Sequence, residues 1–591
     1  MTSETVLASS RENEVAATPQ RSSRRALKRW RTSLLSHGEP IVWLMGGSLI
    51  LALVMIAGLL LLLVIQGTSA LWPAPVVRLE LHDGTVLMGE VTGEDDYPPN
   101  DAQLATRSPE AAIRARDELT QRNDKVHRRL LTTGNFELTQ EHSAWVNDFD
   151  VASESRPEWA LVIERLEWGR FYGFPKAFRE HGVEVESSPA QVWARYLVLH
   201  DEVRERWRKR ENLKRYDLGR LSKLIESRRL EVREIELDKG KESPEWAAAE
   251  EDFLRYRAAI EQQAARVTEE IRALDASNQG YELVMTAADQ REATLPLASV
   301  VRAYPANQLG WWEKLRLWGE RAWEFVSDWP REANSEGGVW PAIFGTVVLT
   351  LIMCVAVVPL GVCGALYLRE YARAGPLVSA VRIAVNNLAG VPSIVFGVFG
   401  LGCFCYILGA NVDELLFRAS LPSPTYGTGG VLWASLTLAL LTLPVVIVAT
   451  EEAVAAVPSS MREGSYACGA SKWQTIRRIV LPRAMPGIMT GAILAVARGA
   501  GEVAPLMLVG AVKLAPDLLV DSVFPYLHPE RSFMHLGFHI YDLAFQSQNS
   551  QAARPMVFTT TLLLILIIAA LNVTAILLRG RLRKRFVTSQ F

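Results

Sequence analysis

Six long stretches with little or no charge decide what this chain can fold into. An α-helix needs roughly 20 apolar residues to cross the hydrocarbon core of a bilayer, and each of the six exceeds that length. Core helices of soluble proteins show apolar runs of about 10–14 residues, which are too short to explain this pattern. The sequence therefore predicts an α-helical integral membrane protein with spans at 41–65, 340–368, 388–410, 430–457, 484–512 and 555–578.

The charged residues are concentrated between the first two predicted spans. Residues 66–340 contain 38 Lys and Arg against 50 Asp and Glu, a net charge of −12, whereas the rest of the chain carries a net charge of +10. A segment of this length can bury a hydrophobic core of its own, and its composition is mixed, unlike that of a linker. We therefore predict a large folded domain between spans one and two, called the insert below.

The insert combines strand and helix patterns. Apolar residues alternate around Asp83-Gly84, which predicts a β-hairpin, and other strand-like runs lie at 136–138, 160–163 and 281–285. The charged stretches 192–238 and 245–274 carry Leu, Ile and Ala and suit helices, with Ser243-Pro244 between them as a helix start. We expect an α+β insert in which an antiparallel helical hairpin projects from a small β-rich base.

Aromatic residues recur at near-helical spacing just before the second span, among them Trp311, Trp318 and Trp329. Charged residues occupy other positions of this stretch. The pattern is typical of an amphipathic helix that lies in the membrane interface. The alternative is that the aromatic side chains pack against the insert's own core.

Basic residues mark the cytoplasmic side of a membrane protein. They are clustered in the leader 1–40, in the tail 581–591, and in the loops after the second and fourth spans. With six crossings all four segments face the same side. We therefore expect both termini in the cytoplasm and residues 66–336 outside.

The sequence contains no pattern that predicts catalysis, a metal site or a cofactor. No Gly-x-x-x-x-Gly-Lys-Ser/Thr phosphate loop occurs, and no Ser/His/Asp or metal-spaced His cluster stands out. The charges of the hairpin are interpreted as solvated helix faces. None of the five cysteines lies in the insert, so no disulfide framework is expected there, and we interpret all five as small packing residues.

The loop between spans four and five, residues 459–483, carries the most specific pattern. It predicts a short helix, a turn at Gly469, and a second amphipathic helix that ends near Pro482. Such a helix–turn–helix is a rigid element on which another protein can act. We call residues 459–483 the elbow.

The elbow resembles the "EAA" loop of bacterial ABC importer permeases. Glu463 is followed six residues later by Gly469 and then by Ile479-x-Leu481-Pro482, while Gly464 and Ser465 replace the usual two alanines. The resemblance implies a type I ABC importer permease fold with five of the six helices in a domain at 337–580. It also implies that the elbow couples to a separate ATPase through Glu463, Gly469, Ala470, Ile479, Leu481 and Pro482.

Four other stretches, 337–346, 387–397, 450–458 and 497–506, look like the permeases of bacterial phosphate importers, and most nearly the PstA group. The resemblance covers residues 41–65 and 337–580 and leaves the insert out. It implies transport of inorganic phosphate across the inner membrane, with the insert in the periplasm and with no enzymatic activity in this chain. The implied partners are a PstC-like second permease, two copies of a PstB-like ATPase, a PstS-like periplasmic phosphate-binding protein and membrane lipid, but no nucleic acid.

Two ionisable residues interrupt the fifth predicted span. Arg498 and Glu502 are four residues apart, so on a helix they share one face, and that face should avoid lipid because a charge in the membrane is costly. One interpretation is that the two charges simply neutralise each other as a structural pair. The other is that they line the substrate path, since the guanidinium of Arg suits phosphate oxygens.

Other assignments are compatible with parts of the sequence. A permease for another oxyanion, such as sulfate or molybdate, would show the same elbow. A polysaccharide chain-length regulator also places an external helical domain between two spans, but this class leaves four helices and the elbow without a purpose. For the insert we expect docking of the binding protein or the partner permease, because its negative charge repels anions.

Overall fold

The computed structural model describes residues 39–587, apart from 101–108, 123, 332–333, 335 and 548–549. Most of the leader 1–40 and the end of the tail 581–591 therefore lie outside the described residues. The chain divides into two compact units between Leu62 and Leu63. Helix α1 (Glu39–Ser69) runs through the first unit and continues into the second.

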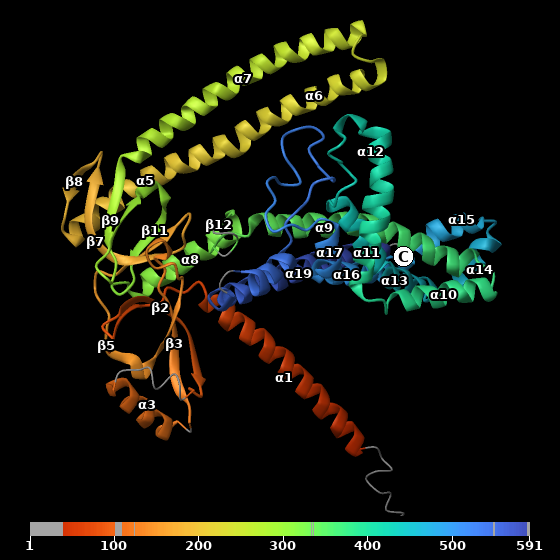
Figure 1. The fold of residues 1–591 in the computed structure, drawn as a ribbon. Coiled ribbons are helices and arrows are strands. Elements are labelled where there is room, and N and C mark those ends of the chain that lie inside the picture. The colour runs from red at the N-terminus through yellow and green to blue at the C-terminus, as the bar shows by residue number, and fades with distance from the viewer. Residues whose placement is uncertain are drawn as a thin grey trace, which may run out of the picture. The chain divides into compact units, whose positions relative to one another are not determined.

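Six helices among the described residues are long and apolar enough to cross a membrane, which confirms the predicted number. Proline and π-helical turns interrupt several of them without ending them. The spans are Val42–Ser69, Trp340–Tyr371, Ser393–Leu416, Val431–Ala455, Lys472–Gly501 and Ala553–Arg581. The corresponding elements in Figure 1 are α9 (Trp340–Leu366), α11 (Ser393–Phe399), α12 (Ala410–Leu416), α13 (Val431–Ala455), α16 (Leu481–Gly501) and α19 (Ser550–Val587).

The predicted limits of two spans are wrong. Residues 376–388 form a separate helix, α10 (Pro376–Leu388), and the third span starts only at Ser393, because Pro392 disfavours the helical conformation of the residue before it. The fifth span ends at Gly501 instead of continuing to 512. Glu502 has extended backbone, with φ −79° and ψ 137°, and a short helix α17 (Ala504–Val509) follows.

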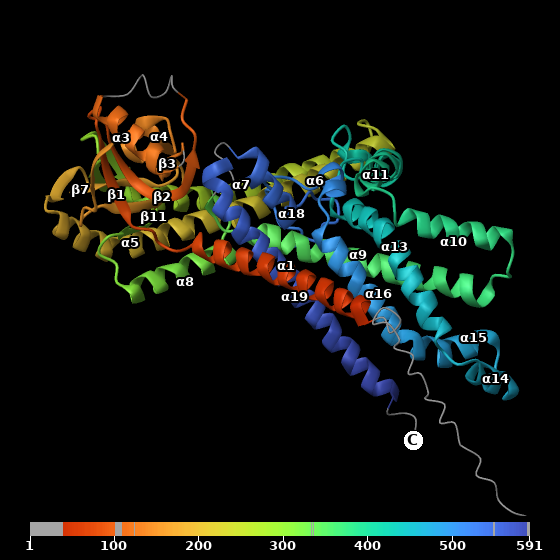
Figure 2. The same ribbon diagram turned by 90° about the horizontal axis from the view of Figure 1, so that it is seen from below.

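Helices α9, α13 and α16 pack against one another and form the core of the membrane domain. Fully buried apolar side chains meet at their centre, among them Leu349 and Met353 of α9, Leu438 of α13 and Ala495 of α16. Burial of such side chains is the main stabilising contribution to this packing. Figure 2 shows these helices side by side, with α14 and α15 at one end.

The insert begins with a five-stranded antiparallel sheet in the order β4-β3-β2-β1-β5. The predicted hairpin is confirmed, since β1 and β2 pair antiparallel across a turn in which Gly84 has φ +85°. That left-handed conformation suits glycine because it carries no Cβ. The strands are β1 (Val76–Leu81), β2 (Val86–Tyr97), β3 (Val126–Thr132), β4 (Ala144–Asn147) and β5 (Val151–Ser155), with helix α3 (Pro109–Gln121) beside them.

A second sheet follows the order β10-β9-β7-β6-β11, with β8 paired to β7. Its side chains pack against helix α5 (Pro189–Asn212) around the fully buried Phe171, Phe178 and Met285. The expected strand at 136–138 is wrong, because this segment is the short helix α4 (Phe136–Thr139). The strands are β6 (Leu161–Arg165), β7 (Phe171–Glu180), β8 (Val183–Glu186), β9 (Tyr281–Thr286), β10 (Glu292–Pro296) and β11 (Val300–Pro305).

The helical hairpin is confirmed as well. Helix α5 continues through a π-helical turn, η2 (Leu213–Leu218), into α6 (Gly219–Lys239), and α7 (Pro244–Gln279) returns beside it (Figure 1). Ser243 caps α7, since its Oγ accepts a hydrogen bond from the Trp246 N–H at 3.2 Å. This is the start that the Ser-Pro pair predicted.

The hairpin contacts loops of the membrane domain. The Nζ of Lys223 on α6 lies 2.9 Å from a carboxylate oxygen of Asp517 and 3.0 Å from one of Asp521. Arg233 donates a hydrogen bond to the carbonyl of Leu421 at 2.7 Å. Two separate loops, 417–430 and 510–535, are therefore tied to the same helix.

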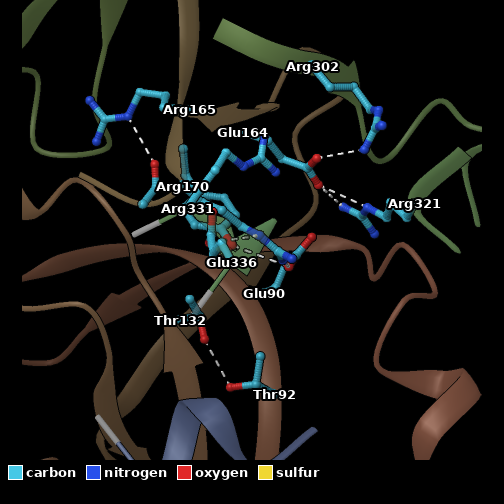
Figure 3. A network of polar contacts seen from close by, with 12 residues as sticks. Glu90, Thr92, Thr132, Glu164, Arg165, Arg170, Arg302, Arg321, Arg331 and Glu336 are labelled. Atoms are coloured by element: carbon cyan, nitrogen blue, oxygen red, sulfur yellow. Dashed lines mark hydrogen bonds and ion pairs between the residues drawn. The ribbon is translucent and has the colours of Figure 1, made fainter. Parts of the chain in front are cut away.

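Helix α8 (Trp311–Ser327) is the Trp-rich helix, and a buried charge network fixes it to the second sheet (Figure 3). Arg321 lies 2.5 Å from Glu164 of β6, and Arg302 of β11 lies 2.8 Å from the same carboxylate. Burial alone would raise the pKa of Glu164, but the two guanidinium groups hold it well below its usual range. The opposite face of α8 leaves Trp311, Trp312 and Trp323 exposed. One face of α8 therefore packs against the insert, and the expectation that this helix lies in the membrane interface stays a prediction.

Candidate functional site

The elbow consists of two helices joined at a glycine. Helix α14 (Ser459–Ala467) ends at Cys468, and Gly469 follows with φ +80°, a conformation that costs a residue with a Cβ about 1–2 kcal/mol. The N–H of Gly469 donates to the Tyr466 carbonyl at 2.9 Å and closes the turn. Ser471 then caps α15 (Lys472–Thr475) in a capping box with Gln474. The predicted turn at Gly469 is therefore present.

The second half of the elbow is continuous with a membrane span. Helix α15 passes through a π-helical turn, η8 (Ile476–Val480), directly into α16. The expectation that this helix ends near Pro482 is wrong. Because the helix continues through η8, Pro482 stands inside it, and the π-helical turn lies just before this proline. A displacement of the elbow would consequently be transmitted straight into α16.

Ionic contacts anchor the elbow to the end of α9. Arg462 lies 3.1 Å from Glu370 in η5 (Tyr367–Tyr371), and its guanidinium also donates to the carbonyls of Val454 and Val457. Lys472 donates to the backbone carbonyl of Glu370. These three charged residues were not among the predicted site residues, because no local sequence pattern shows that the ends of α9 and α13 meet.

Some of the predicted coupling residues are exposed, and the others are half-buried. Glu463 and Gly469 are exposed, and no atom lies within 4 Å of the place where a Cβ of residue 469 would stand. Leu481 instead packs against a buried apolar cluster that includes Val480 and Ile488. The half-buried members of the predicted set are Ala470, Ile479, Leu481 and Pro482.

Two exposed aromatic side chains extend the outer surface of the elbow. Tyr466 of α14 is 43% exposed and Trp473 of α15 is 56% exposed. Tyr and Trp are enriched at protein interfaces, where they supply large rigid contact areas. Arg477 and Arg478 are also exposed on the following turn. The elbow therefore presents an aromatic surface with positive charge beside it.

The two charged residues of the fifth span form a pair. The Nε of Arg498 lies 3.5 Å from an oxygen of Glu502, and their side chains are 35% and 22% exposed. The expectation that they lie in the middle of a helix is wrong, since Arg498 stands in the last turn of α16 and Glu502 just beyond its end. Neighbouring Gly499 is buried against Met353 of α9, so the packed face of α16 is a different one.

No group of three or more His, Cys, Asp or Glu side chains that could hold a metal occurs in the part of the chain that the structure describes. The candidate site is made of the elbow and the charged end of α16. Six apolar spans with an exposed helical elbow continuous with one of them are the arrangement expected of a membrane permease.

Comparison with known proteins identifies the family. Residues 357–588 match the family described as binding-protein-dependent transport system inner membrane component. The chain belongs to this family of ABC transporter permeases and is an integral membrane protein with the type I permease fold. The insert lies outside the matched residues.

Two relatives and one solved structure illustrate the similarity. The phosphate transport system permease protein PstA of Mycobacterium leprae (strain TN) is 40% identical over 219 residues, which are 36% of this chain and 62% of that protein. The phosphate transport system permease protein PstA 1 of Mycobacterium tuberculosis (strain CDC 1551 / Oshkosh) is 36% identical over 243 residues, which are 41% of this chain and 71% of that protein. An inward-facing structure of the MetNI methionine ABC transporter is 18% identical, with a TM-score of 0.30, and the match covers 44% of this chain and 98% of that one.

Proposed function

We propose that this chain is a permease subunit of an ATP-driven importer that moves inorganic phosphate across the bacterial inner membrane. The observation that carries the proposal is the exposed elbow, which continues without a break into the charged span α16. The choice of phosphate rests on the names of the two mycobacterial relatives. The permease domain would comprise residues 337–580.

In this proposal the elbow docks on the ATPase. Tyr466 and Trp473 would enter an apolar recess of that partner, with Glu463 and Gly469 at the contact. The ion pair between Arg462 and Glu370 would make α9 move together with α14. Rotation of the elbow by the ATPase would then reach Arg498 through the continuous helix α16. Leu481 would not contact the ATPase but would hold the elbow against the membrane helices through its buried apolar cluster.

A second permease subunit follows from the surface of α16. Leu494, Arg498 and Gly501 lie at helical intervals on one side of this helix, and none of them is buried. A charged residue in a span is costly when it faces lipid, by roughly 2.5–3.5 kcal/mol on insertion scales. We infer that a PstC-like subunit, also a permease, covers this face and that the substrate path runs between the two. Arg498 would bind the phosphate oxygens, and Glu502 would orient Arg498.

The remaining partners follow from the family description, which names a binding-protein-dependent system. We expect two copies of a PstB-like ATPase at the two elbows and a PstS-like phosphate-binding protein on the other side of the membrane. This chain would perform no ATP hydrolysis itself.

The distribution of charge supports one orientation. The leader, the tail and the elbow side are basic, which favours the cytoplasm for both termini. The hairpin of the insert contacts loops 417–430 and 510–535, at the ends of the spans opposite the elbow. Residues 66–336 would then lie in the periplasm.

The insert would serve as a docking element for the binding protein or the partner permease. Its ion pairs to Asp517 and Asp521 hold the 510–535 loop, which presents the exposed apolar side chains Phe524 and Tyr526. Its own net charge of −12 does not suit it to collecting an anion.

The test is ATPase stimulation in the reconstituted complex. The full complex would be assembled in lipid, and ATP hydrolysis measured with the binding protein loaded with phosphate, sulfate or molybdate. Stimulation by phosphate alone is expected. Stimulation by sulfate or molybdate but not phosphate would overturn the substrate assignment, and stimulation by none would overturn the importer assignment.

A further inference from the structure

One buried arginine of the insert lacks a hydrogen-bond acceptor in the part of the chain that the structure describes. Arg204 of α5 is only 8% exposed, and its Nε and Nη1 atoms are buried without a hydrogen-bond acceptor among the described residues. Its guanidinium lies over the ring of Trp207, 4.1 Å from the centroid. A buried charge normally keeps at least one hydrogen-bonding partner. This unsatisfied guanidinium therefore calls for an anion.

The surroundings of Arg204 are positive. Arg208 lies one helical turn further along α5 and is exposed, and Arg331 comes from the short strand β12 (Pro330–Arg331). Burial, together with the charges of these two arginines, lowers the pKa of Arg204 to about 10. At neutral pH the side chain is still protonated, so three positive charges stand close together.

The acidic groups nearby do not satisfy Arg204. Glu324 of α8 forms ion pairs with Arg302 at 2.9 Å and with Arg331 at 2.6 Å, although its Oε1 receives no hydrogen bond among the described residues. Asp328 is close enough to influence Arg204 electrostatically but forms no hydrogen bond with it. Positive charge therefore exceeds negative charge around Arg204, and Arg208 and Arg331 contribute to this excess.

The position of these arginines suggests where an anion comes from. Arg331 precedes by nine residues the start of span α9 at Trp340. Trp329, beside it, lies under the guanidinium of Arg215, 3.8 Å from the ring centroid. Tryptophan is typical of the headgroup layer, and α8 exposes three more Trp side chains just before this segment. The phosphate groups of lipids lie in that layer.

We propose that Arg204, Arg208 and Arg331 form a binding site for a phosphate group at the junction between the insert and the first turn of α9. Arginine is suited to this ligand, because its planar fork donates two parallel hydrogen bonds to phosphate oxygens. The phosphate group is either that of an anionic lipid headgroup or free inorganic phosphate. Its occupancy would tie the insert to the entrance of a membrane span.

The test measures thermal unfolding of the full-length protein, without the ATPase, in a sugar-based detergent that contains no phosphate. Inorganic phosphate is added in one arm, with chloride at equal ionic strength as its control, and short-chain phosphatidylglycerol in the other. A ligand at about a hundredfold above its Kd should raise the unfolding midpoint by about 2–5 °C, the larger value applying if the insert unfolds as a separate unit. A rise with phosphatidylglycerol only assigns a lipid headgroup, and a rise with inorganic phosphate assigns the free anion.

The variants locate the effect. Arg204→Gln should abolish the rise and, without ligand, should unfold above the wild type, because it removes an unpaired buried charge. Arg204→Lys keeps the charge but loses the fork, so a smaller rise is expected. Arg255→Gln, at an exposed position of α7 paired with Glu251, is the matched control for charge and should behave like the wild type. Because Arg498 is itself proposed to bind phosphate, the inorganic-phosphate arm is also run with Arg498→Gln in the background, where the rise that depends on Arg204 should remain.

Two results would overturn the proposal. One is a wild type whose midpoint responds to neither probe. The other is a response that Arg204→Gln retains in full. If Arg204→Gln does not fold, Arg208→Gln at an exposed position takes its place, and an unchanged rise in that variant counts against the site.

Discussion

The turn at Gly469 offers the sharpest test of the elbow. We compare Gly469→Asp with Gly469→Asn, two side chains of nearly the same size that differ in charge. The left-handed conformation at φ +80° would cost an ordinary residue about 1–2 kcal/mol, but Asn and Asp tolerate it better than others. No atom lies within 4 Å of the added Cβ. Both variants should therefore fold and insert in the membrane like the wild type.

The two variants should differ in coupling. If residue 469 lies in the contact with the ATPase, docking of Gly469→Asp buries a carboxylate without a partner, which costs several kcal/mol. Every 1.4 kcal/mol lowers an equilibrium constant tenfold, so complex formation should fall at least a hundredfold. Gly469→Asn carries an amide that can find a hydrogen bond and should lose less than tenfold.

The assay is co-purification of the ATPase with the full-length permease, together with phosphate uptake and the amount of permease in the membrane. Normal uptake by Gly469→Asp would remove the coupling assignment. Equal loss in both variants, at normal membrane levels, would show that the conformation of the turn matters and that its charge does not. Either result would refute the idea that a buried charge at residue 469 blocks docking of the ATPase.

Three further predictions concern the rest of the chain. If the guanidinium of Arg498 binds substrate, Arg498→Lys should transport phosphate poorly. The double variant Arg498→Gln/Glu502→Gln should then assemble in the membrane but take up no phosphate. Uptake by the double variant would instead indicate that the two charges are a purely structural pair. Replacement of residues 76–305 by a short flexible linker should weaken complex assembly more than anion selectivity, and unchanged co-purification and uptake would contradict the docking role. Glu164→Gln should destabilise the insert by about 3–5 kcal/mol, because it leaves two arginines with less compensation. Since the folded-state pKa of Glu164 is depressed, its stabilisation is complete above about pH 4.3 and is lost as the pH falls below that value, so unfolding midpoints between pH 6 and pH 3 should fall more steeply in the wild type than in the variant.

Local patterns predicted much of this protein correctly. The Asp83-Gly84 turn, the Ser243-Pro244 helix start and the bend at Gly469 all appear where the sequence places them. Each depends on the conformational preference of one or two residues, which acts whatever the rest of the chain does. Most of the errors concern boundaries, apart from residues 136–138, which form a short helix instead of a strand. The apolar run of the fifth span continues past the helix end at Gly501, because the short helix α17 that follows is apolar too.

Local sequence patterns could not predict contacts between segments that are distant in the chain. Lys223 meets Asp517 and Asp521 across almost 300 residues, and Arg462 meets Glu370 across about 90. A charged residue on a helix is an ordinary solvated side chain until the fold brings a partner to it. The same holds for Arg204, whose burial without a partner cannot be distinguished in the sequence from the many exposed arginines of the hairpin.

The sequence by itself determined that the chain crosses the membrane six times, that an acidic α+β domain separates the first two spans, and that an elbow of this family's kind follows the fourth. Length, apolar character and turn residues are enough for these, because a bilayer demands about 20 apolar residues per crossing. Only the tertiary structure decided that the elbow is one piece with α16, that Glu164 anchors α8, and which charges are paired. The interaction energy of a charge depends on the distance to its partner and on burial, and both exist only once the chain is folded.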